Sequence, residues 1–255
     1  MNITVSSNSK ELGKLAGQKA AELIREAINA KGEAAIILAT GSSQFETINQ
    51  LISEKGINWG AVTMFHLDEY ISLPKEHPAN FGKYLKERFL NHIPPLKKVF
   101  LIDGNSDANK EVTYLNDVIR NFDIDVALVG VGENGHLAFN DPPANYDITD
   151  PFIIVELDDI SRQQQVNEGW FEGIEVVPKQ SITMTIHQIC NSSHIICSVP
   201  EKRKSDAVAN CFGNGISNLY PASILQNHKS CFLFLERVSA EKLLANHPSK
   251  IDIDV

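Results

Sequence analysis

Residues 126–136 read VALVGVGENGH, an apolar run that passes straight into a glycine-rich turn. The four residues Val126–Val129 carry no polar side chain, as expected for a parallel strand that is covered on both faces. The glycines that follow allow the backbone to turn tightly and to approach a ligand. Ligands of open parallel sheets bind beyond the carboxyl ends of the strands, so this stretch predicts an α/β fold with its site at the turn.

The turn carries His136, and the carboxylate of Asp141 follows five residues later. Proton transfer at a reacting carbon needs an acid or a base within hydrogen-bond reach, and these two side chains form a candidate pair. The alternative is that His136 is a loop residue that makes only structural hydrogen bonds. Its place at the end of a buried strand favours the catalytic interpretation.

Strands and helices are predicted to alternate along the rest of the chain. The patterns predict strands over 34–39, 62–67, 99–102, 152–155, 181–186, 194–199 and 231–235, and helices over 9–30, 81–91, 109–121 and 204–212, with one up to Ile52 and one from Ser239. Repeated strand–helix units indicate the α/β class, with a Rossmann-like, open, mostly parallel sheet and helices on both faces. No Pro-, Gly- or Ser-rich linker divides the chain, so residues 1–255 are predicted to form a single domain. Residues 144–178 are less regular and predict a lid over the site.

The composition argues against several classes of protein. The formal net charge is −9, and an acidic surface is repelled by nucleic acids and by anionic membranes. No apolar run approaches the roughly 20 residues that span a bilayer. The cysteines form no CxxC pair and the histidines show no metal-ligand spacing, so no metal site is expected. The start of the chain carries no signal segment, and a cytoplasmic location is expected.

A short polar loop, Thr40-Gly41-Ser42-Ser43, stands between a predicted strand and a predicted helix. Backbone N–H groups and peptide dipoles favour an anion at a helix N-terminus. The loop lacks the lysine of a nucleotide-binding P-loop, so it predicts a phosphate site of another kind. The alternative is a simple serine helix cap.

Asp68-Glu69-Tyr70 follows the predicted strand that ends at Leu67 and is predicted to be a loop. Neighbouring side chains of an extended chain point in different directions, so at most one of the two carboxylates is expected to face a substrate. A carboxylate with a raised pKa is suited to act as a base at a carbon beside a carbonyl. The alternative is a solvated turn.

Basic residues are sparse, so their positions are informative. Arg162 begins the run RQQQ at 162–165, and the run KRK at 202–204 opens a predicted helix. Arg162 and a lysine beside Arg203 are predicted to clamp a phosphate. The alternative for the basic run is a solvated turn.

Taken together, these motifs resemble the glucosamine-6-phosphate deaminase family, in the same order and at similar spacing. The matching segments are 40–43, 67–70, the glycine–histidine run through Asp141, and 221–228. The most specific parts are Leu-Asp-Glu-Tyr and Gly-x-Gly-x-x-Gly-His-x-Ala-Phe-Asn. The resemblance covers nearly the whole chain.

The resemblance implies an aldose–ketose isomerase/deaminase that converts glucosamine 6-phosphate to fructose 6-phosphate and ammonia without a cofactor, and that is also counted as a hydrolase. It implies that His136 assists opening of the sugar ring and that Asp68 moves a proton between C2 and C1. Asp141 would support His136, and Asn134 is counted with these catalytic residues.

The same resemblance implies how a phosphorylated amino sugar is held. The substrate-binding set consists of Thr40, Gly41, Ser42, Ser43, Glu69, Arg162 and Lys204. Lys204 fits the family's Lys-x-x-Ala-Val pattern, and Lys202 is a nearby alternative. A homo-oligomer is one implied state, because family members often associate.

The chain also departs from the family pattern. Asp141 stands where well-known members place the longer glutamate, and Asn134 stands where aspartate is often found. The run at 162–165 differs as well, which leaves the sugar itself open. Residues 144–160 contain no Lys or Arg, whereas allosterically controlled members bind a phosphorylated activator with basic residues near here. No such activation is therefore expected.

Two other functions remain as alternatives. The related 6-phosphogluconolactonases, which hydrolyse a sugar lactone, share the fold and the Gly-His turn but typically follow it with a different sequence. A non-catalytic sugar-phosphate sensor would keep the fold, but such sensors are usually joined to a DNA-binding helix-turn-helix, for which there is no room before Ile36. The presence of both Asp68 and His136 favours an enzyme.

Overall fold

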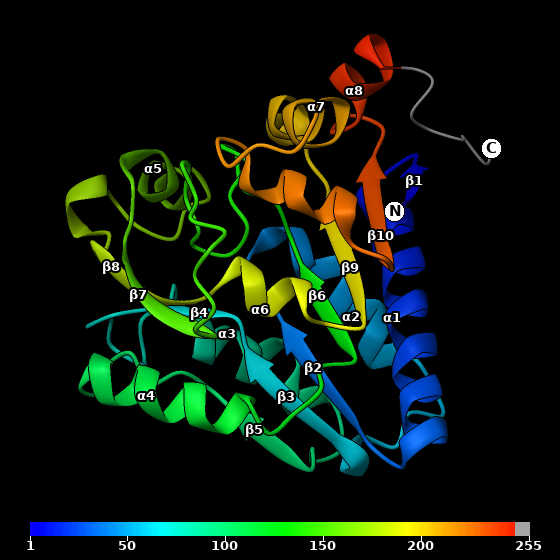
Figure 1. Ribbon diagram of the computed structural model, residues 1–255, viewed down its shortest axis with the longest axis vertical. Helices are drawn as coiled ribbons and strands as arrows, with labels where there is room; N and C mark the ends of the chain where they lie inside the picture. Colours follow the sequence, from blue (N-terminus) through cyan, green and yellow to red (C-terminus); the bar gives the residue numbers. More distant parts are fainter. Residues whose placement is uncertain (248–255) are drawn as a thin grey trace.

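The computed structural model describes residues 1–247, and its central feature is a sheet of seven parallel strands (Figure 1). Across the sheet the order is β1-β10-β9-β6-β2-β3-β5, and each neighbouring pair is parallel. The strands are β1 (Asn2–Ser6), β10 (Cys231–Glu236), β9 (His194–Val199), β6 (Val126–Val129), β2 (Ala34–Leu38), β3 (Val62–His66) and β5 (Lys98–Phe100). The predicted open parallel sheet is confirmed, while residues 248–255 of the predicted domain lie outside the described residues.

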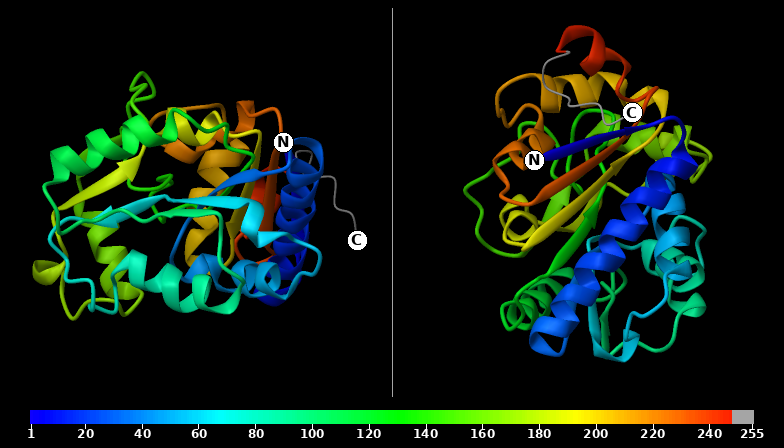
Figure 2. Two further views of the ribbon diagram at one scale, coloured as in Figure 1. Left: turned by 90° about the horizontal axis from the view of Figure 1, so that it is seen from below. Right: turned by 90° about the vertical axis from the view of Figure 1, so that its right-hand side faces the viewer.

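Helices cover both faces of this sheet, as predicted (Figure 2). Because side chains alternate along a strand, Ile36 and Leu38 of β2 pack with one helical layer, and Ala35 and Ile37 pack with the other. The first layer holds α1 (Ser9–Lys31), α2 (Phe45–Ser53) and α3 (Phe81–Arg88), and the second holds α4 (Ala108–Ile119), α6 (Ile186–Cys190), α7 (Ser205–Gly213) and α8 (Glu241–Asn246). No helix within residues 1–247 has the length and apolar character that crossing a bilayer requires.

The strand order reverses between β2 and β6. The chain passes from β2 outward to β3 and β5, and it later places β6 on the other side of β2, with β9 beyond it. Open parallel sheets bind their ligands at such a switch point, beyond the carboxyl ends of the strands. The ends of β9, β6, β2 and β3 therefore surround one position.

A second, smaller sheet stands beside the central one and is antiparallel. In it, β8 (Gln180–Met184) pairs with β4 (Asp68–Tyr70) on one side and with β7 (Phe152–Glu156) on the other. The prediction of a loop at 68–70 is wrong, because this backbone pairs with a segment far along the chain that no local pattern reveals. β7 and α5 (Asp159–Asn167) both fall within the predicted lid. The 3-10 helices are η1 (Ser42–Gln44), η2 (Trp59–Ala61), η3 (Leu90–His92), η4 (Ile174–Val176), η5 (Lys202–Lys204) and η6 (Pro221–Asn227).

Two glycines of α1 form its close contact with α2. A Cβ added at Gly13 would lie 2.2 Å from Glu46 Cβ, and one added at Gly17 would lie 2.6 Å from Gln50 Cβ. Since these positions carry no side chain, the two helices touch backbone against backbone. α2 follows directly on the polar loop at 40–43, so this contact also positions the loop.

Candidate active site

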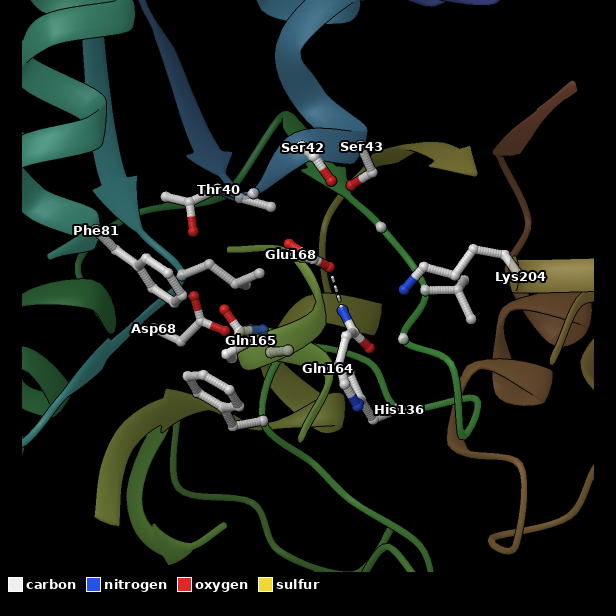
Figure 3. Close-up of a pocket in the computed structure, with 18 of the residues that line it drawn as sticks. Thr40, Ser42, Ser43, Asp68, Phe81, His136, Gln164, Gln165, Glu168 and Lys204 are labelled. Carbon is white, nitrogen blue, oxygen red and sulfur yellow. Dashed lines mark hydrogen bonds between the residues drawn. The ribbon is translucent and has the colours of Figure 1, made fainter. Parts of the chain in front are cut away.

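A cavity of about 590 Å³, counted with its open mouth, lies beyond the carboxyl ends of β2, β3, β6 and β9 (Figure 3). The cavity therefore lies at the edge of the sheet that the sequence predicts. Aromatic rings of Phe81 and Phe139 form part of the wall. The polar side chains that line it are Thr40, Ser42, Ser43, Asp68, His136, Gln164, Gln165, Glu168, Arg203 and Lys204.

The glycine-rich turn after β6 seats His136 on the cavity wall. The N–H of Gly132 donates to the carbonyl oxygen of His136 at 3.0 Å, and Gly135 adopts a φ of 85°, which favours glycine. A Cβ on Gly132 would lie 2.1 Å from Cε1 of the imidazole. Glycine at 132 therefore leaves the space that the ring occupies.

The imidazole of His136 is held from behind by a serine and a carboxylate. Its Nδ1 lies 2.9 Å from Ser161 Oγ and 3.2 Å from Asp141 Oδ1, and Ser161 donates a short hydrogen bond to Asp141. Because the serine proton points to Asp141, the serine oxygen accepts from the imidazole, which assigns the proton of neutral His136 to Nδ1. This tautomer leaves Nε2 with a lone pair for proton transfer.

Asn134 and Asp141 support His136 without lining the cavity. The Asn134 amide donates to Asp141 Oδ1 at 3.1 Å and to Asp158 Oδ2 at 3.2 Å, and its oxygen accepts the backbone N–H of His136 at 3.0 Å. Burial raises the pKa of Asp141, but hydrogen bonds and charge from His136, Ser161 and Asn134 outweigh burial and lower it to about 2. The shorter aspartate side chain thus reaches His136 and stays ionised.

Asp68 lines the cavity at the start of β4 and is 7% exposed. Burial, with a smaller contribution from the charge of Glu69, raises the pKa of Asp68 to about 8. A carboxyl group with a pKa near neutrality can both take a proton and return it. Asp68 is therefore suited to the acid/base role predicted for it.

Glu69, the neighbouring carboxylate, does not line the cavity. It accepts hydrogen bonds from the backbone N–H groups of Tyr70, Phe81 and Gly82 at 3.0, 3.2 and 2.8 Å, at the start of α3. Burial raises its pKa to about 7, and these hydrogen bonds oppose the rise. The extended backbone turns Glu69 away from Asp68 and toward a helix N-terminus, so its contact with substrate stays a prediction.

The loop at 40–43 and Lys204 line the same cavity. Gly41 adopts a φ of 92° just before η1, a conformation that favours glycine. Lys204 is 3% exposed, and burial lowers its pKa to about 8. Lys202 lies on the surface with its Nζ 3.5 Å from Glu241, so Lys204 is the lysine of this run that lines the cavity.

The positive charge of Arg203 is neutralised by ion pairs with carboxylates of the protein. Its guanidinium lies 2.7 Å from Glu133 and 2.9 Å from Glu168, and it also pairs closely with Glu201. It donates to Ser42 Oγ at 3.3 Å. These bonds join the polar loop, the glycine-rich turn and the end of α5 into one wall.

Arg162 lies on a face of α5 that does not line the cavity. Its guanidinium donates to Asp159 at 2.9 Å and to the carbonyl oxygens of Ile174 and Val177 around η4. The structure therefore places Arg162 outside the cavity lining, and its contact with a phosphate stays a prediction. The sequence pattern could not show which face of α5 meets the cavity.

Residues around α5 that the sequence analysis gave no role complete the site. Gln164, Gln165 and Glu168 line the cavity (Figure 3). Ser161 holds His136 by a hydrogen bond. These residues stand at i, i+3, i+4 and i+7, the spacing of one helix face. This spacing groups the four polar residues on one face of a helix, but it does not show that this face meets the cavity.

The cavity offers hydroxyl, amide, amine, imidazole and carboxyl groups. Within the described part of the chain, no three His, Cys, Asp or Glu side chains meet in a way that could hold a metal ion. Its cysteines are free thiols, and three of them are buried. The donors present fit a polyhydroxylated anion.

Comparison with known proteins assigns a family. Residues 7–234 match the family described as glucosamine-6-phosphate isomerases/6-phosphogluconolactonase. The chain belongs to this family. The resemblance that the sequence motifs indicate is thereby confirmed.

Members of the family with known names are similar over nearly the full chain. A glucosamine-6-phosphate deaminase of Exiguobacterium sp. is 31% identical over 243 residues, which cover 95% of this chain and 92% of that protein. The structure of a monomeric glucosamine-6-phosphate deaminase has a TM-score of 0.87 at 29% identity and covers 95% of this chain and 100% of that one. A 6-phosphogluconolactonase of Trypanosoma brucei has a TM-score of 0.77 at 19% identity, with 95% and 98% covered, and shows the shared fold alone.

Proposed function

We propose that this family member converts glucosamine 6-phosphate to fructose 6-phosphate and ammonia without a cofactor. The observation that carries the proposal is that Asp68 and His136 line one cavity together with the 40–43 loop and Lys204. An acid/base pair and anion-binding groups around one space suit a sugar whose phosphate anchors it while its other end reacts. Deaminases similar to this chain bear the activity in their names.

The chemistry of the proposed reaction balances with water. Glucosamine 6-phosphate and water give fructose 6-phosphate and ammonia, while the carbonyl group moves from C1 to C2. No electrons are exchanged with an outside carrier, so the balance calls for no redox cofactor. The activity is therefore an isomerisation coupled to deamination, rather than simple hydrolysis.

His136 is proposed to open the sugar ring. Its Nε2, which carries the lone pair, takes the proton of the C1 hydroxyl and delivers it to the ring oxygen as the C1–O5 bond breaks. The charge that forms on the imidazole is stabilised by Asp141, which lies 3.2 Å from Nδ1, and by the hydroxyl of Ser161. The ring opens to an aldehyde at C1.

Asp68 is proposed to move the proton that shifts the carbonyl. As a carboxylate it takes the proton from C2 while the C1 oxygen gains a proton, which gives an enolamine. It then returns its proton to C1 while the nitrogen loses a proton, which leaves an imine at C2 and a hydroxyl on C1. Water then adds to C2 and ammonia leaves, which forms the ketone. The raised pKa of about 8 allows Asp68 to act in both directions near neutral pH.

The phosphate is proposed to lie on the loop at 40–43 with Lys204. The loop leads into η1 and α2, where N–H groups at the helix start have no helical partner and attract an anion. No carboxylate of residues 1–247 lies within ion-pair distance of Lys204 Nζ, so its charge is available to a ligand. Arg203, by contrast, is already paired with protein carboxylates.

The test is an assay of ammonia and ketose from a panel of hexosamine 6-phosphates and pentose phosphates. We expect equal amounts of ammonia and fructose 6-phosphate from glucosamine 6-phosphate. Folded protein that releases neither product would contradict the proposal. Hydrolysis of 6-phosphogluconolactone in the same assay would support the lactonase alternative, and sugar-phosphate binding without turnover would support the sensor.

A further inference from the structure

The side chain of Gln165 stands in the cavity wall without a partner. The residue is 7% exposed and lines the cavity, and its amide makes no hydrogen bond with any residue between 1 and 247. Most polar groups of a protein interior have a hydrogen-bond partner, whereas the amide of Gln165 is open to the cavity and bonds to no protein group in the described part of the chain. A ligand in the cavity would give this amide a partner.

The two neighbouring glutamines are in a different situation. The amide of Gln164 donates to Glu168 at 2.8 Å and its oxygen accepts the backbone N–H of Glu133 at 3.0 Å. Gln163 lies on the exposed face of α5 and donates to Asn167 at 3.1 Å. Among these three residues, only Gln165 has an amide that faces the cavity without a partner in the described part of the protein.

Gln165 lies on the Asp68 side of the cavity. In Figure 3 the two side chains point toward one another, and Lys204 enters from the opposite side. A group that faces the carboxylate acting on C1 and C2 meets the substituents of C2 and C3. The amino group on C2 leaves during the reaction, whereas the hydroxyl on C3 remains.

We infer that Gln165 binds the C3 hydroxyl of the sugar and so holds C2 against Asp68. An amide offers one acceptor oxygen and two N–H donors, and a hydroxyl both donates and accepts, so the two groups can exchange a pair of hydrogen bonds. The inference rests on the proposed function, because it takes an amino-sugar phosphate as the ligand. It adds a residue that distinguishes sugars by the group on C3.

The variant that tests this role is Gln165→Met, which keeps the length of the side chain and removes the amide. We expect kcat/KM for glucosamine 6-phosphate to fall about 10-fold to 100-fold, the range for one buried hydrogen-bonding group. The Tm should stay equal or rise, because no hydrogen bond of the free protein is lost. Gln163→Met, the same substitution on the exposed face of α5, should change neither quantity.

Binding measured by calorimetry identifies the hydroxyl. The ligands are 2-amino-2-deoxyglucitol 6-phosphate, which has no carbonyl and cannot isomerise, and its 3-deoxy counterpart. The wild-type protein should bind the first about 10-fold to 100-fold more tightly, and Gln165→Met should bind the two with similar affinity. A variant that keeps the wild-type preference would overturn the inference, as would a Tm well below that of Gln163→Met.

Failure of the proposed function would give a different result. In that case the wild-type protein releases no ammonia and binds neither alditol. If the wild-type protein releases ammonia and binds the first alditol, but Gln165→Met behaves like the wild type, the proposed function stands and the role of Gln165 is lost.

Discussion

Burial brings the pKa values of two cavity residues together. Asp68 is 7% exposed and Lys204 is 3% exposed, and each loses hydration of its charged form. The pKa of Asp68 rises to about 8, while the pKa of Lys204 falls to about 8. Both groups therefore titrate over the same narrow range, which makes the reaction sensitive to pH there.

We expect kcat/KM to peak near pH 8. Asp68 must lose its proton to act as a base, so the rate rises with pH through its raised pKa, and Lys204 must keep its proton to hold the phosphate, so the rate falls above its lowered pKa. The measurement is kcat/KM from about pH 6 to about pH 10.

The control for the falling limb is Lys204→Arg, whose guanidinium stays protonated over this range. The substrate's own groups titrate alike with both proteins, so a difference between the two profiles reports on the enzyme. The falling limb should move to higher pH or disappear in the variant. If the falling limb is unchanged in Lys204→Arg, the fall in kcat/KM belongs to the titration of another group.

We expect Asp68→Asn to abolish turnover, to keep sugar-phosphate binding and to raise the Tm at alkaline pH. The pKa of Asp68 is raised from 3.8 to about 8 in the folded protein, so ionisation of Asp68 in the unfolded chain lowers the stability of the fold increasingly as pH rises between these values. Asparagine removes this cost, and about 1 kcal/mol is worth about 2–4 °C in a chain of this size. Calorimetry should show little gain near about pH 4 and a gain of several degrees above about pH 8. A gain that is independent of pH would argue against a buried charge at Asp68.

At the scale of elements, α5 divides its side chains between two tasks. The helical repeat turns Gln164 and Gln165 toward the cavity, and it turns Arg162 toward η4, where its guanidinium holds two carbonyl oxygens. The position of the loop at 40–43 depends on the position of α2, which follows the loop in the chain. α2 is positioned by its close contact with α1.

We expect Gly13→Ala to destabilise the protein and to raise KM for the sugar phosphate. Helix propensity alone favours alanine by about 1 kcal/mol. The new Cβ, however, would lie 2.2 Å from Glu46 Cβ and 2.5 Å from the Glu46 carbonyl carbon, and backbone cannot move aside as the end of a side chain can. Overpacking costs about 1–3 kcal/mol or more, so the clash outweighs the propensity and displaces α2 with its loop.

Urea unfolding and steady-state kinetics measure the two effects. Lys14→Ala is the matched control, because Lys14 is exposed on the same helix and the substitution also introduces an alanine. The control should lie within about 0.5 kcal/mol of the wild type. If Gly13→Ala unfolded at a higher urea concentration than the wild type and had an unchanged KM, the two helices would have to move apart without moving the loop.

At the scale of the whole molecule, the parallel sheet brings the site together. Asp68, His136 and Lys204 come after β3, β6 and β9, and these strands end at the same edge because they all run in one direction. The reversal of strand order between β2 and β6 opens the crevice that the cavity occupies. A homo-oligomer remains a prediction, and one similar deaminase structure is described as monomeric.

We expect no activation by a phosphorylated amino sugar other than the substrate. Residues 144–160 contain no Lys or Arg to bind a second phosphate. The measurement is the rate at substrate concentrations below KM, with and without an N-acetylated hexosamine 6-phosphate, and the expected ratio is 1 or less. An increase in rate would reveal a second phosphate site elsewhere in the molecule.

The sequence by itself determined the class of fold and the centre of the site. Apolar runs and glycines are local signals, so the parallel sheet, the loop at 40–43 and the turn that holds His136 could be predicted from short stretches. Asp68 could be predicted because it follows directly on a buried strand. Strand ends meet at one edge in every parallel sheet, so these residues were also expected to lie together.

Folding settled the direction of each side chain and its distant partners. Glu69 and Arg162 turn to backbone groups, while Ser161 bridges His136 and Asp141. These contacts join segments that are far apart along the chain, so no neighbouring residue reports them. Residue type indicates what chemistry a side chain can perform, but only the packing of β4 and α5 against the central sheet determines which side chains face the cavity.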